Sequence, residues 1–256
     1  MKIHPTAIVH KNAKLADDVE VGPYSIIEEN ASIDSGTIVG NHCFIGSFTT
    51  IGKNNRIFTG AVVGSISQDL KFKGDESFLQ IGDENLIREY VTMNRSSEKG
   101  KKTVVGNNNL FMAYAHIGHD SVIGNGTIIA NCGTLGGYVT IENKAIMGGL
   151  SGAHQFTKIG RLAIIGGCSK VVQDIPPYCM ADGHPAAVRG INLVGLRRAE
   201  FPSAKIEAIR KAIKLLFFSK LTIKSAVEKI ISDIPPSLEI NNIIDFIKSS
   251  KRGLSK

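Results

Sequence analysis

The chain has 256 residues, a net charge of +7 and an apolar fraction of 43%, with few aromatic residues and no tryptophan. This length suits one or two domains, and no apolar run is long enough for a signal peptide or a membrane span. The positive charge favours an acidic partner, but the basic residues form no stripe interleaved with aromatic side chains, which disfavours nucleic acid. We therefore expect a cytoplasmic protein without a nucleic-acid partner.

From Ile3 to Val171, nearly every sixth residue is large and aliphatic, and a glycine often follows it directly. Such a short repeat at a fixed period is typical of a solenoid. Three strands of six residues would close one coil with the aliphatic side chains inside. Residues about 18 positions apart should then stack at the strand spacing of about 4.8 Å. We predict a parallel β-solenoid over residues 1–185.

Two polar stretches interrupt the repeat and leave its register unchanged on either side. They are residues 65–78 and 94–103, which we expect to be loops that project from the solenoid. Loops on a rigid scaffold are frequent sites of binding and catalysis. These two segments are therefore the first places to look for functional residues.

The pattern changes after the repeat. Residues 186–202 are expected to form a connecting segment, and the apolar residues that follow have helical spacing. Ser203 is the expected N-cap of a first helix, a second should begin after Thr222, and a third after Pro235-Pro236. We predict an α-helical C-terminal domain over residues 186–256 that caps one end of the solenoid and covers its strand edge.

The sequence His116-Ile-Gly-His119-Asp120 carries the strongest chemical signal. Ile117 belongs to the inward series, so His116 and His119 should flank it on the outer surface. An exposed histidine beside an aspartate is suited to act as a general base, because the carboxylate fixes the imidazole tautomer and stabilises the imidazolium.

Coil arithmetic places further polar groups beside this pair. Gly137 follows His119 by 18 positions, so its backbone should stack on His119, where its N–H could stabilise an oxyanion. Gln155, preceded by His154, lies one coil further along the same ridge. Polar groups along one corner of the solenoid indicate a groove.

Two other interpretations remain open at this point: a cluster without function, and a zinc site like that of the solenoid carbonic anhydrases, formed by His116, His119 and His154. Zinc needs convergent ligands and supporting hydrogen bonds, whereas His116 and His119 flank an inward residue in extended chain. The four cysteines form no CxxC pair and are expected to be buried thiols; they are Cys43, Cys132, Cys168 and Cys179. We expect no metal site.

Several motifs together resemble one family across essentially the whole chain. They are the hexads, Gln68-Asp69-Leu70-Lys71, His116-Ile-Gly-His119-Asp120, His154-Gln155-Phe156, Gly166-Gly167-Cys168, Gly195-Leu196-Arg197-Arg198 and Arg252-Gly253. The chain resembles the acyl-[acyl-carrier-protein]–UDP-N-acetylglucosamine O-acyltransferases, which catalyse the first step of lipid A biosynthesis.

This resemblance implies a left-handed parallel β-helix and a homotrimer with active sites between neighbouring prisms, without a cofactor. It implies that His119 is the general base, held by Asp120, and that Gly137 supplies the oxyanion N–H. The base would deprotonate the 3-hydroxyl of the UDP-linked sugar, which attacks the thioester of a 3-hydroxyacyl chain on acyl carrier protein. The basic charge fits docking of that acidic carrier.

The resemblance also implies a set of substrate-binding residues. Those that match positions around the sugar nucleotide are Asp69, Lys71, His116, His154 and Gln155; Asn192 and Arg198 match positions at the uridine diphosphate. Arginine is well suited to phosphate oxygens. Gly167 matches the position that limits acyl length, where glycine leaves room for a long chain.

One departure affects the acceptor. Tyr138 stands where the family commonly has a histidine near the sugar. A relative acting on a 3-amino sugar would form an amide, so an N-acylating enzyme remains an alternative. So do a coenzyme-A-dependent acetyltransferase and the N-acyltransferase of the same pathway, although that enzyme carries an extra domain before its solenoid. Fold alone does not decide among these activities.

Overall fold

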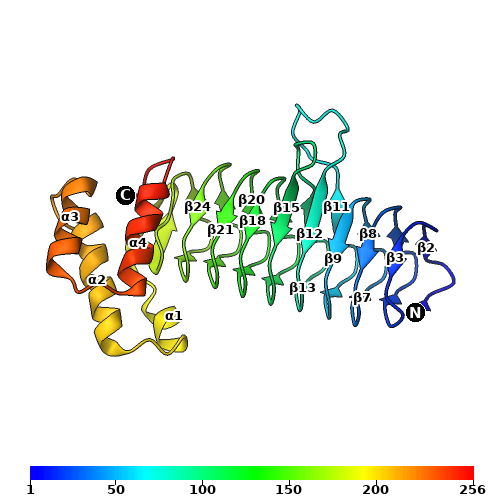
Figure 1. The fold of residues 1–256 in the computed structure, drawn as a ribbon, viewed down its shortest axis with the longest axis horizontal. Coiled ribbons are helices and arrows are strands. Elements are labelled where there is room, and N and C mark those ends of the chain that lie inside the picture. The colour runs from blue at the N-terminus through cyan, green and yellow to red at the C-terminus, as the bar shows by residue number, and fades with distance from the viewer.

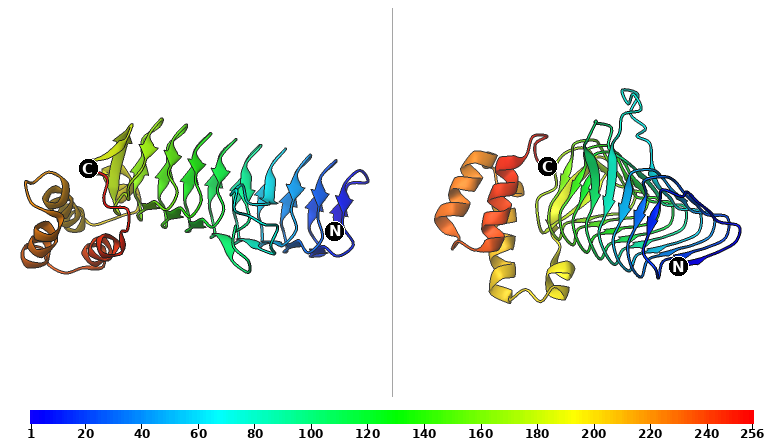
Figure 2. Two further views of the ribbon diagram at one scale, coloured as in Figure 1. Left: turned by 90° about the horizontal axis from the view of Figure 1, so that it is seen from above. Right: turned by 45° about the vertical axis from the view of Figure 1, so that its right-hand side comes forward.

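The computed structural model describes residues 1–256, which form a long left-handed parallel β-helix with a group of α-helices at one end (Figure 1). The coils are triangular in cross-section (Figure 2). Successive strands of the chain pass from one sheet to the next, so strands that pair in a sheet come from successive coils. The predicted fold class is confirmed.

Three sheets, here called A, B and C, form the sides of the prism. Sheet A consists of β1 (Lys2–Ile3), β4 (Glu20–Val21), β7 (Ile38–Val39), β10 (Arg56–Ile57), β13 (Leu86–Ile87), β16 (Leu110–Phe111), β19 (Ile128–Ile129), β22 (Ile146–Met147), β25 (Ile164–Ile165), β27 (Cys179–Gly183) and β28 (Ala186–Ile191). Sheet B consists of β2 (Ile8–Val9), β5 (Ile26–Ile27), β8 (Phe44–Ile45), β11 (Val62–Ser65), β14 (Thr92–Asn94), β17 (His116–Ile117), β20 (Thr134–Leu135), β23 (Gly152–Ala153) and β26 (Lys170–Val171). Sheet C consists of β3 (Lys14–Leu15), β6 (Ser32–Ile33), β9 (Thr49–Ile51), β12 (Phe78–Ile81), β15 (Lys102–Val105), β18 (Val122–Ile123), β21 (Thr140–Ile141) and β24 (Lys158–Ile159).

The aliphatic series forms the interior of the prism, as predicted. Ile27 and Ile45, which are partners in sheet B, and Ile117 further along are all fully buried. Because every coil donates and accepts backbone hydrogen bonds with its neighbours, each added coil satisfies its own polar groups and extends one continuous core.

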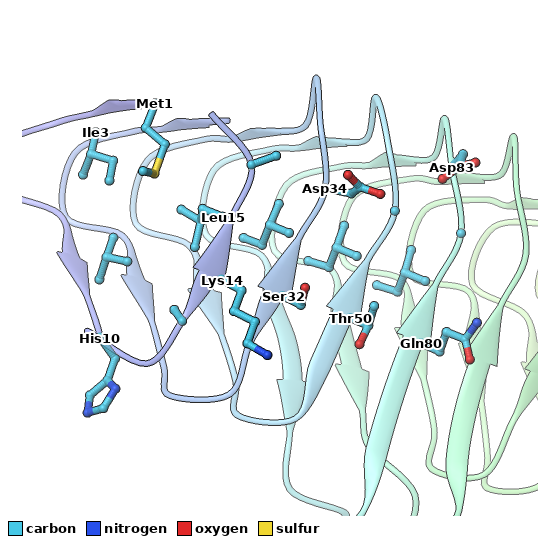
Figure 3. Close-up of a pocket in the computed structure, with 18 of the residues that line it drawn as sticks. Met1, Ile3, His10, Lys14, Leu15, Ser32, Asp34, Thr50, Gln80 and Asp83 are labelled. Atoms are coloured by element: carbon cyan, nitrogen blue, oxygen red, sulfur yellow. The ribbon is translucent and has the colours of Figure 1, made fainter. Parts of the chain in front are cut away.

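The first coil is less well covered than the rest. Ile3 is 40% exposed, whereas its partner Val21 on the next coil is 3% exposed. Ile3, Leu15 and Met1 lie together at the edge of a cavity of about 1060 Å³ (Figure 3). The inward position is thus buried only where a coil stacks on both sides.

Both interrupting loops leave the same edge of the prism. The chain between β11 and β12 stands out from the solenoid (Figure 1), and the chain between β14 and β15 lies one coil further on. Each loop leads from a strand of sheet B to a strand of sheet C. We call this edge the B–C corner, and name the other edges the C–A and A–B corners in the same way.

The segment expected to connect solenoid and helices is more regular than predicted. β28 pairs antiparallel with β27 at the end of sheet A, and α1 (Leu193–Arg198) follows it. The strand β28 therefore continues the sheet beyond residue 185, the predicted domain boundary. The partition into two domains stays a prediction.

The C-terminal helices are α2 (Ser203–Phe217), α3 (Ile223–Asp233) and α4 (Leu238–Ser249). α3 begins directly after Thr222, as predicted, and the Thr222 hydroxyl caps it by accepting from the Ser225 amide. The prediction for Ser203 is wrong: Pro202 is the N-cap, and Ser203 is the first helical residue. The Pro202 carbonyl accepts the first helical hydrogen bond, from the Ile206 amide at 3.1 Å, which places the N-cap one residue earlier than expected. None of the helices has the length and apolar character needed to cross a membrane.

The end of the chain returns to the last coil. The buried carboxylate of Asp174 accepts from the Lys158 amide at 2.8 Å and from the Ser250 hydroxyl at 2.6 Å. The Asp174 backbone also bonds Gly253 and Ser255. This aspartate therefore ties the C-terminal segment to the solenoid.

Candidate active site

A polar cavity of about 610 Å³ lies at the B–C corner, beneath the first projecting loop. Six residues that the sequence singled out line it together: Asp69, Lys71, His116, His119, Gly137 and Gln155. Only two of its lining residues are apolar, so it is unlike the cavity at the first coil. Charged, amide and imidazole groups from successive coils and one loop thus converge on a single volume.

His119 and Asp120 form the predicted pair. The Nδ1 atom of His119 lies 2.8 Å from Oδ2 of Asp120. Because an ionised carboxylate only accepts, Nδ1 carries the proton and Nε2 is the free basic nitrogen. One expectation is wrong: His119 is 9% exposed rather than open to solvent, because the ring of Tyr138 and the backbone of Gly137 pack against it.

Asp120 is held by the second loop as well as by the histidine. Its carboxylate accepts hydrogen bonds from the Ser96 hydroxyl, from the Ser97 hydroxyl at 2.7 Å and from the Ser97 amide at 3.0 Å. Burial alone would raise the pKa of Asp120, but these hydrogen bonds and the one from His119 outweigh it and lower the pKa below its usual value. The carboxylate is therefore ionised wherever the histidine can act as a base.

Gly137 lies directly against the His119 ring, as the coil arithmetic predicted. A Cβ atom on Gly137 would be 2.5 Å from Nε2 and 2.4 Å from Cε1 of His119, so only glycine fits beside the imidazole. The Gly137 carbonyl accepts from the Phe156 amide, but its own N–H has no hydrogen-bond partner in the chain. A free N–H therefore stands beside the basic nitrogen at the cavity wall.

Tyr138 supports the histidine without lining the cavity. Its ring meets that of His119 edge to face, with centroids 5.4 Å apart, and stacks on Phe156 at 4.7 Å. Its hydroxyl donates to Glu98 Oε1 at 2.9 Å and lies 3.2 Å from the Ser97 hydroxyl. The phenol is thus directed to the second loop rather than to the acceptor position implied by the resemblance.

The first loop presents a cation and a carboxylate to the cavity. Asp69 accepts from the Lys71 amide at 2.9 Å, which closes a tight turn that carries both side chains. Nearby, Nδ1 of His116 lies 2.7 Å from the Thr92 hydroxyl. Burial and then the neighbouring His119 lower the pKa of His116, so it is a neutral hydrogen-bonding group at neutral pH.

Asn94 also lines the cavity, although the sequence did not single it out. Its amide nitrogen donates to Ser65 Oγ and Ile66 O, and its buried amide oxygen has no partner. A signal was available: on the next two coils the equivalent position of the B–C corner is glycine, at Gly118 and Gly136. An asparagine in a glycine series indicates a special role.

Four predicted site residues do not line this cavity. His154 is exposed and bonds its neighbour's carbonyl, and Gly167 lies at the A–B corner, between β25 and β26. Asn192 caps α1 through the Gly195 amide and donates to Leu162 O, while Arg198 is exposed at the end of that helix. One chain therefore leaves Gly167, Asn192 and Arg198 away from this cavity, whereas His154 lies at the same corner beside Gln155 without lining it.

No three histidine, cysteine, aspartate or glutamate side chains are grouped as a metal site. His154 does not join His116 and His119 in the cavity. Of the cysteines, Cys43 and Cys179 are buried as expected, but Cys132 is half-buried and Cys168 is exposed. The expectation of buried thiols fails for Cys168 because it occupies the turn of the A–B corner and points away from the core.

Comparison with known proteins identifies the family of the chain. A family model described as Udp N-acetylglucosamine O-acyltransferase, Domain 2, matches residues 174–255, and the bacterial transferase hexapeptide model matches residues 102–137. The chain is 45% identical to the acyl-[acyl-carrier-protein]–UDP-N-acetylglucosamine O-acyltransferase of Myxococcus xanthus, covering 100% of this chain and 99% of that one.

Solved structures of similar proteins have the same fold. The UDP-N-acetylglucosamine acyltransferase of Bacteroides fragilis matches with a TM-score of 0.97 at 42% identity, over 99% of both chains. The enzyme of Moraxella catarrhalis matches with a TM-score of 0.96 at 39% identity, over the whole of both chains. Full-length identity at this level, with the fold unchanged from end to end, shows that the chain belongs to the acyl-[acyl-carrier-protein]–UDP-N-acetylglucosamine O-acyltransferase family of lipid A biosynthesis.

Proposed function

We propose that this acyltransferase moves a 3-hydroxyacyl group from acyl carrier protein to the 3-hydroxyl of UDP-N-acetylglucosamine, with His119 as the general base. The observation that carries the proposal is the position of His119. One ring nitrogen bonds Asp120, and the free nitrogen lies against Gly137, whose N–H has no partner. Base and oxyanion donor thus meet at one wall of a polar cavity.

The chemistry follows from these positions. Nε2 of His119 removes the proton from the sugar hydroxyl as its oxygen attacks the thioester carbonyl. The carbonyl oxygen becomes an oxyanion, which the Gly137 N–H stabilises, while Asp120 stabilises the imidazolium. Collapse of the tetrahedral intermediate breaks the carbon–sulfur bond, and the departing thiolate of the carrier protein takes the proton from His119. The new ester and a free thiol are the products.

The first loop supports the nucleotide sugar in this proposal. Lys71 and Asp69 line the same cavity as the base and offer a cation and hydrogen-bond acceptors to a sugar nucleotide. The cavity is mostly polar, which suits a sugar better than an acyl chain. The acyl chain and the uridine diphosphate therefore need additional surface.

That surface is best supplied by a second copy of the chain. Gly167 lies at the A–B corner, whereas His119 lies at the B–C corner of the same prism. If Gly167 and Arg198 act with His119, a neighbouring prism must present its own A–B corner and α1 to this cavity. We therefore propose a homotrimer with its active sites between prisms, in which the acidic carrier protein docks on the basic surface. A cytoplasmic location belongs to the same proposal.

The first test is His119→Ala, assayed by mass spectrometry with a ladder of acyl-carrier donors. Loss of a general base should lower kcat by about 10²- to 10⁴-fold, with the oligomer and melting temperature unchanged. His10→Ala, which removes an exposed histidine on the first coil, is the matched control. Retention of more than a tenth of the activity by His119→Ala would contradict a base role.

Parallel assays with the 3-hydroxyl and the 3-amino sugar decide the acceptor. Ester formation on UDP-N-acetylglucosamine supports the proposal. Amide formation on the amino sugar, with no ester on UDP-N-acetylglucosamine, would contradict the proposed acceptor but leave the proposed roles of His119, Asp120 and Gly137 unchanged.

A further inference from the structure

The second loop makes contacts that the proposed chemistry does not require and that need an explanation. Residues 95–101, here called the serine turn, join β14 to β15. The turn is fixed at both ends: the Arg95 amide bonds Ser65 O, the Ser96 amide bonds Phe78 O, and the Gly100 amide bonds Glu76 O. It is therefore a rigid element seated between the first loop and the Asp120 coil.

The serine turn surrounds the Asp120 carboxylate. Ser96 is fully buried, and its hydroxyl bonds Oδ1; the Ser97 hydroxyl and amide both bond Oδ2, which also accepts from His119. Four donors on one carboxylate leave it few orientations. On the other side, the Thr103 hydroxyl accepts from the Asp120 amide at 2.8 Å. Both the side chain and the backbone of Asp120 are therefore restrained.

Tyr138 contacts both the serine turn and the His119–Asp120 pair and holds them together. Its hydroxyl bonds Glu98 and contacts Ser97, and its ring covers His119. Burial and then the Glu98 and Asp120 carboxylates raise the pKa of Tyr138, offset in part by Ser97, so the phenol remains a neutral donor. A connected set of side chains thus runs from exposed Glu98 through Tyr138 and Ser97 to Asp120 and His119.

We propose that Ser96 and Ser97 are positioning residues of the acyl transfer, which hold Asp120 in the orientation that directs the free nitrogen of His119 at the acceptor hydroxyl, and that Tyr138 locks them in place. This inference rests on the proposed base role of His119. The physical reason is that an aspartate bonded only to the histidine can rotate away from it. The three further donors fix the Asp120 carboxylate, which in turn fixes the tautomer and the ring plane of His119.

The test is the double variant Ser96→Ala/Ser97→Ala. Its kcat should fall by about tenfold or more, the scale for losing hydrogen bonds that orient a functional side chain, with the KM for the sugar nucleotide unchanged. The other titratable groups near the pair are His116, Tyr138 and Glu98, with Asp69 and Lys71 in the same cavity. The double variant replaces none of them, and of these titratable groups only the Tyr138 hydroxyl loses a contact, the one with Ser97. Without the serine donors the pair binds protons more tightly, so the acidic limb of the kcat/KM profile should move to higher pH.

Two further variants sharpen this test. Ser97→Thr on its own keeps a hydroxyl and should retain both kcat and the pH limb, whereas Ser97→Ala should not. Tyr138→Phe keeps the ring but loses the bonds to Glu98 and Ser97, so its effect should have the same direction and a smaller size. Ser35→Ala, which removes a serine–aspartate hydrogen bond to Asp18 at an exposed turn, is the matched control and should behave as the parent.

The outcomes separate the two proposals. An inactive His119→Ala beside a double serine variant with parental kcat and pH limb would overturn the positioning role alone. A loss in the double variant that comes with a raised KM and an unmoved pH limb would also overturn it, because that pattern indicates a general distortion of the site. If His119→Ala stays active, the base role fails first.

Discussion

The C–A and B–C corners of the prism have the same backbone arrangement, but a ladder of amide N–H groups is paired at one and the Gly137 N–H is left open at the other. At the C–A corner, side-chain oxygens of one coil accept the amide N–H of the coil before: Asp83 accepts from Lys53, Asn107 from Asp83, Asn125 from Asn107, and Asn143 from Asn125. These contacts are 2.7 to 2.8 Å long. Every corner amide of this ladder from Lys53 to Asn125 is thereby satisfied.

The B–C corner repeats that backbone without the ladder. The Phe156 amide bonds Gly137 O at 3.1 Å, as the Lys144 amide bonds Asn125 O at 2.8 Å. Gly137 thus occupies the place of Asn125, and Gln155 occupies that of Asn143. Gln155 is one methylene longer and does not accept from the amide before it, so the Gly137 N–H stays open. A structural hydrogen bond is absent where the proposed oxyanion site needs a donor.

The variant Gln155→Asn should remove this difference between the corners. Of the variants that test the comparison, it has the largest expected effect on kcat. An asparagine at position 155 has the same length as Asn143 of the ladder, so its Oδ1 would accept a hydrogen bond from the Gly137 N–H. The N–H would then no longer be available to an oxyanion. Loss of one such donor typically costs about 10²- to 10³-fold in kcat. The melting temperature should not fall, because a hydrogen bond is gained. Steady-state kinetics with thermal unfolding test this, and parental kcat would mean that the amide does not act in the reaction.

The Asp120 carboxylate of the B–C corner should also differ in its pH dependence from the neutral asparagines of the ladder. The pKa of Asp120 is lower in the folded chain than the value of about 3.9 in an unfolded one. Its stabilising contribution is therefore fully present above that unfolded value and is lost as the pH falls through the folded value. The gap in melting temperature between the parent and Asp120→Asn should be widest near neutral pH and narrow under acid. A gap that does not change with pH would contradict the ionised, hydrogen-bonded carboxylate.

The variant Asn125→Ala leaves the Asn107 amide without its acceptor and has the smallest expected effect of these variants. It removes the acceptor of the Asn107 N–H at an exposed turn, so stability should fall by about 1 kcal/mol, with no change in kcat and no dependence on acid pH. Chemical denaturation at two pH values measures this. A clear loss of activity would show that the two corners are coupled, and the comparison would then fail.

Much of the site could be predicted from periodicity. A fixed repeat places residue 137 on residue 119 whatever the side chains are, because stacked strands must satisfy their backbone groups coil by coil. The same reasoning predicted both loops, and the structure adds that each follows a strand of sheet B and so leaves the same edge. The stacking of His119 and Gly137, with Gln155 one coil further, followed from this, whereas Asp69 and Lys71 were indicated only by the resemblance to the family.

Within the two loops the repeat predicts no contacts. Tertiary packing alone determines which hydrogen bonds the loop residues make. The capture of Asp120 by Ser96 and Ser97, the turn of Tyr138 toward Glu98, and the orphaned oxygen of Asn94 all depend on how an irregular segment folds back on the coils. The burial of His119 also depends on packing, because the ring of Tyr138 and the backbone of Gly137 on the next coil cover it.

The sequence by itself determined the solenoid, its register and the family of the chain. Only the tertiary structure decided which polar groups near His119 are free to act and which are already paired, and that Gly167 and Arg198 lie apart from His119 on a single prism. The reason is physical: a repeat specifies where backbone strands stack, whereas hydrogen-bond partners and burial depend on contacts between segments that no period relates.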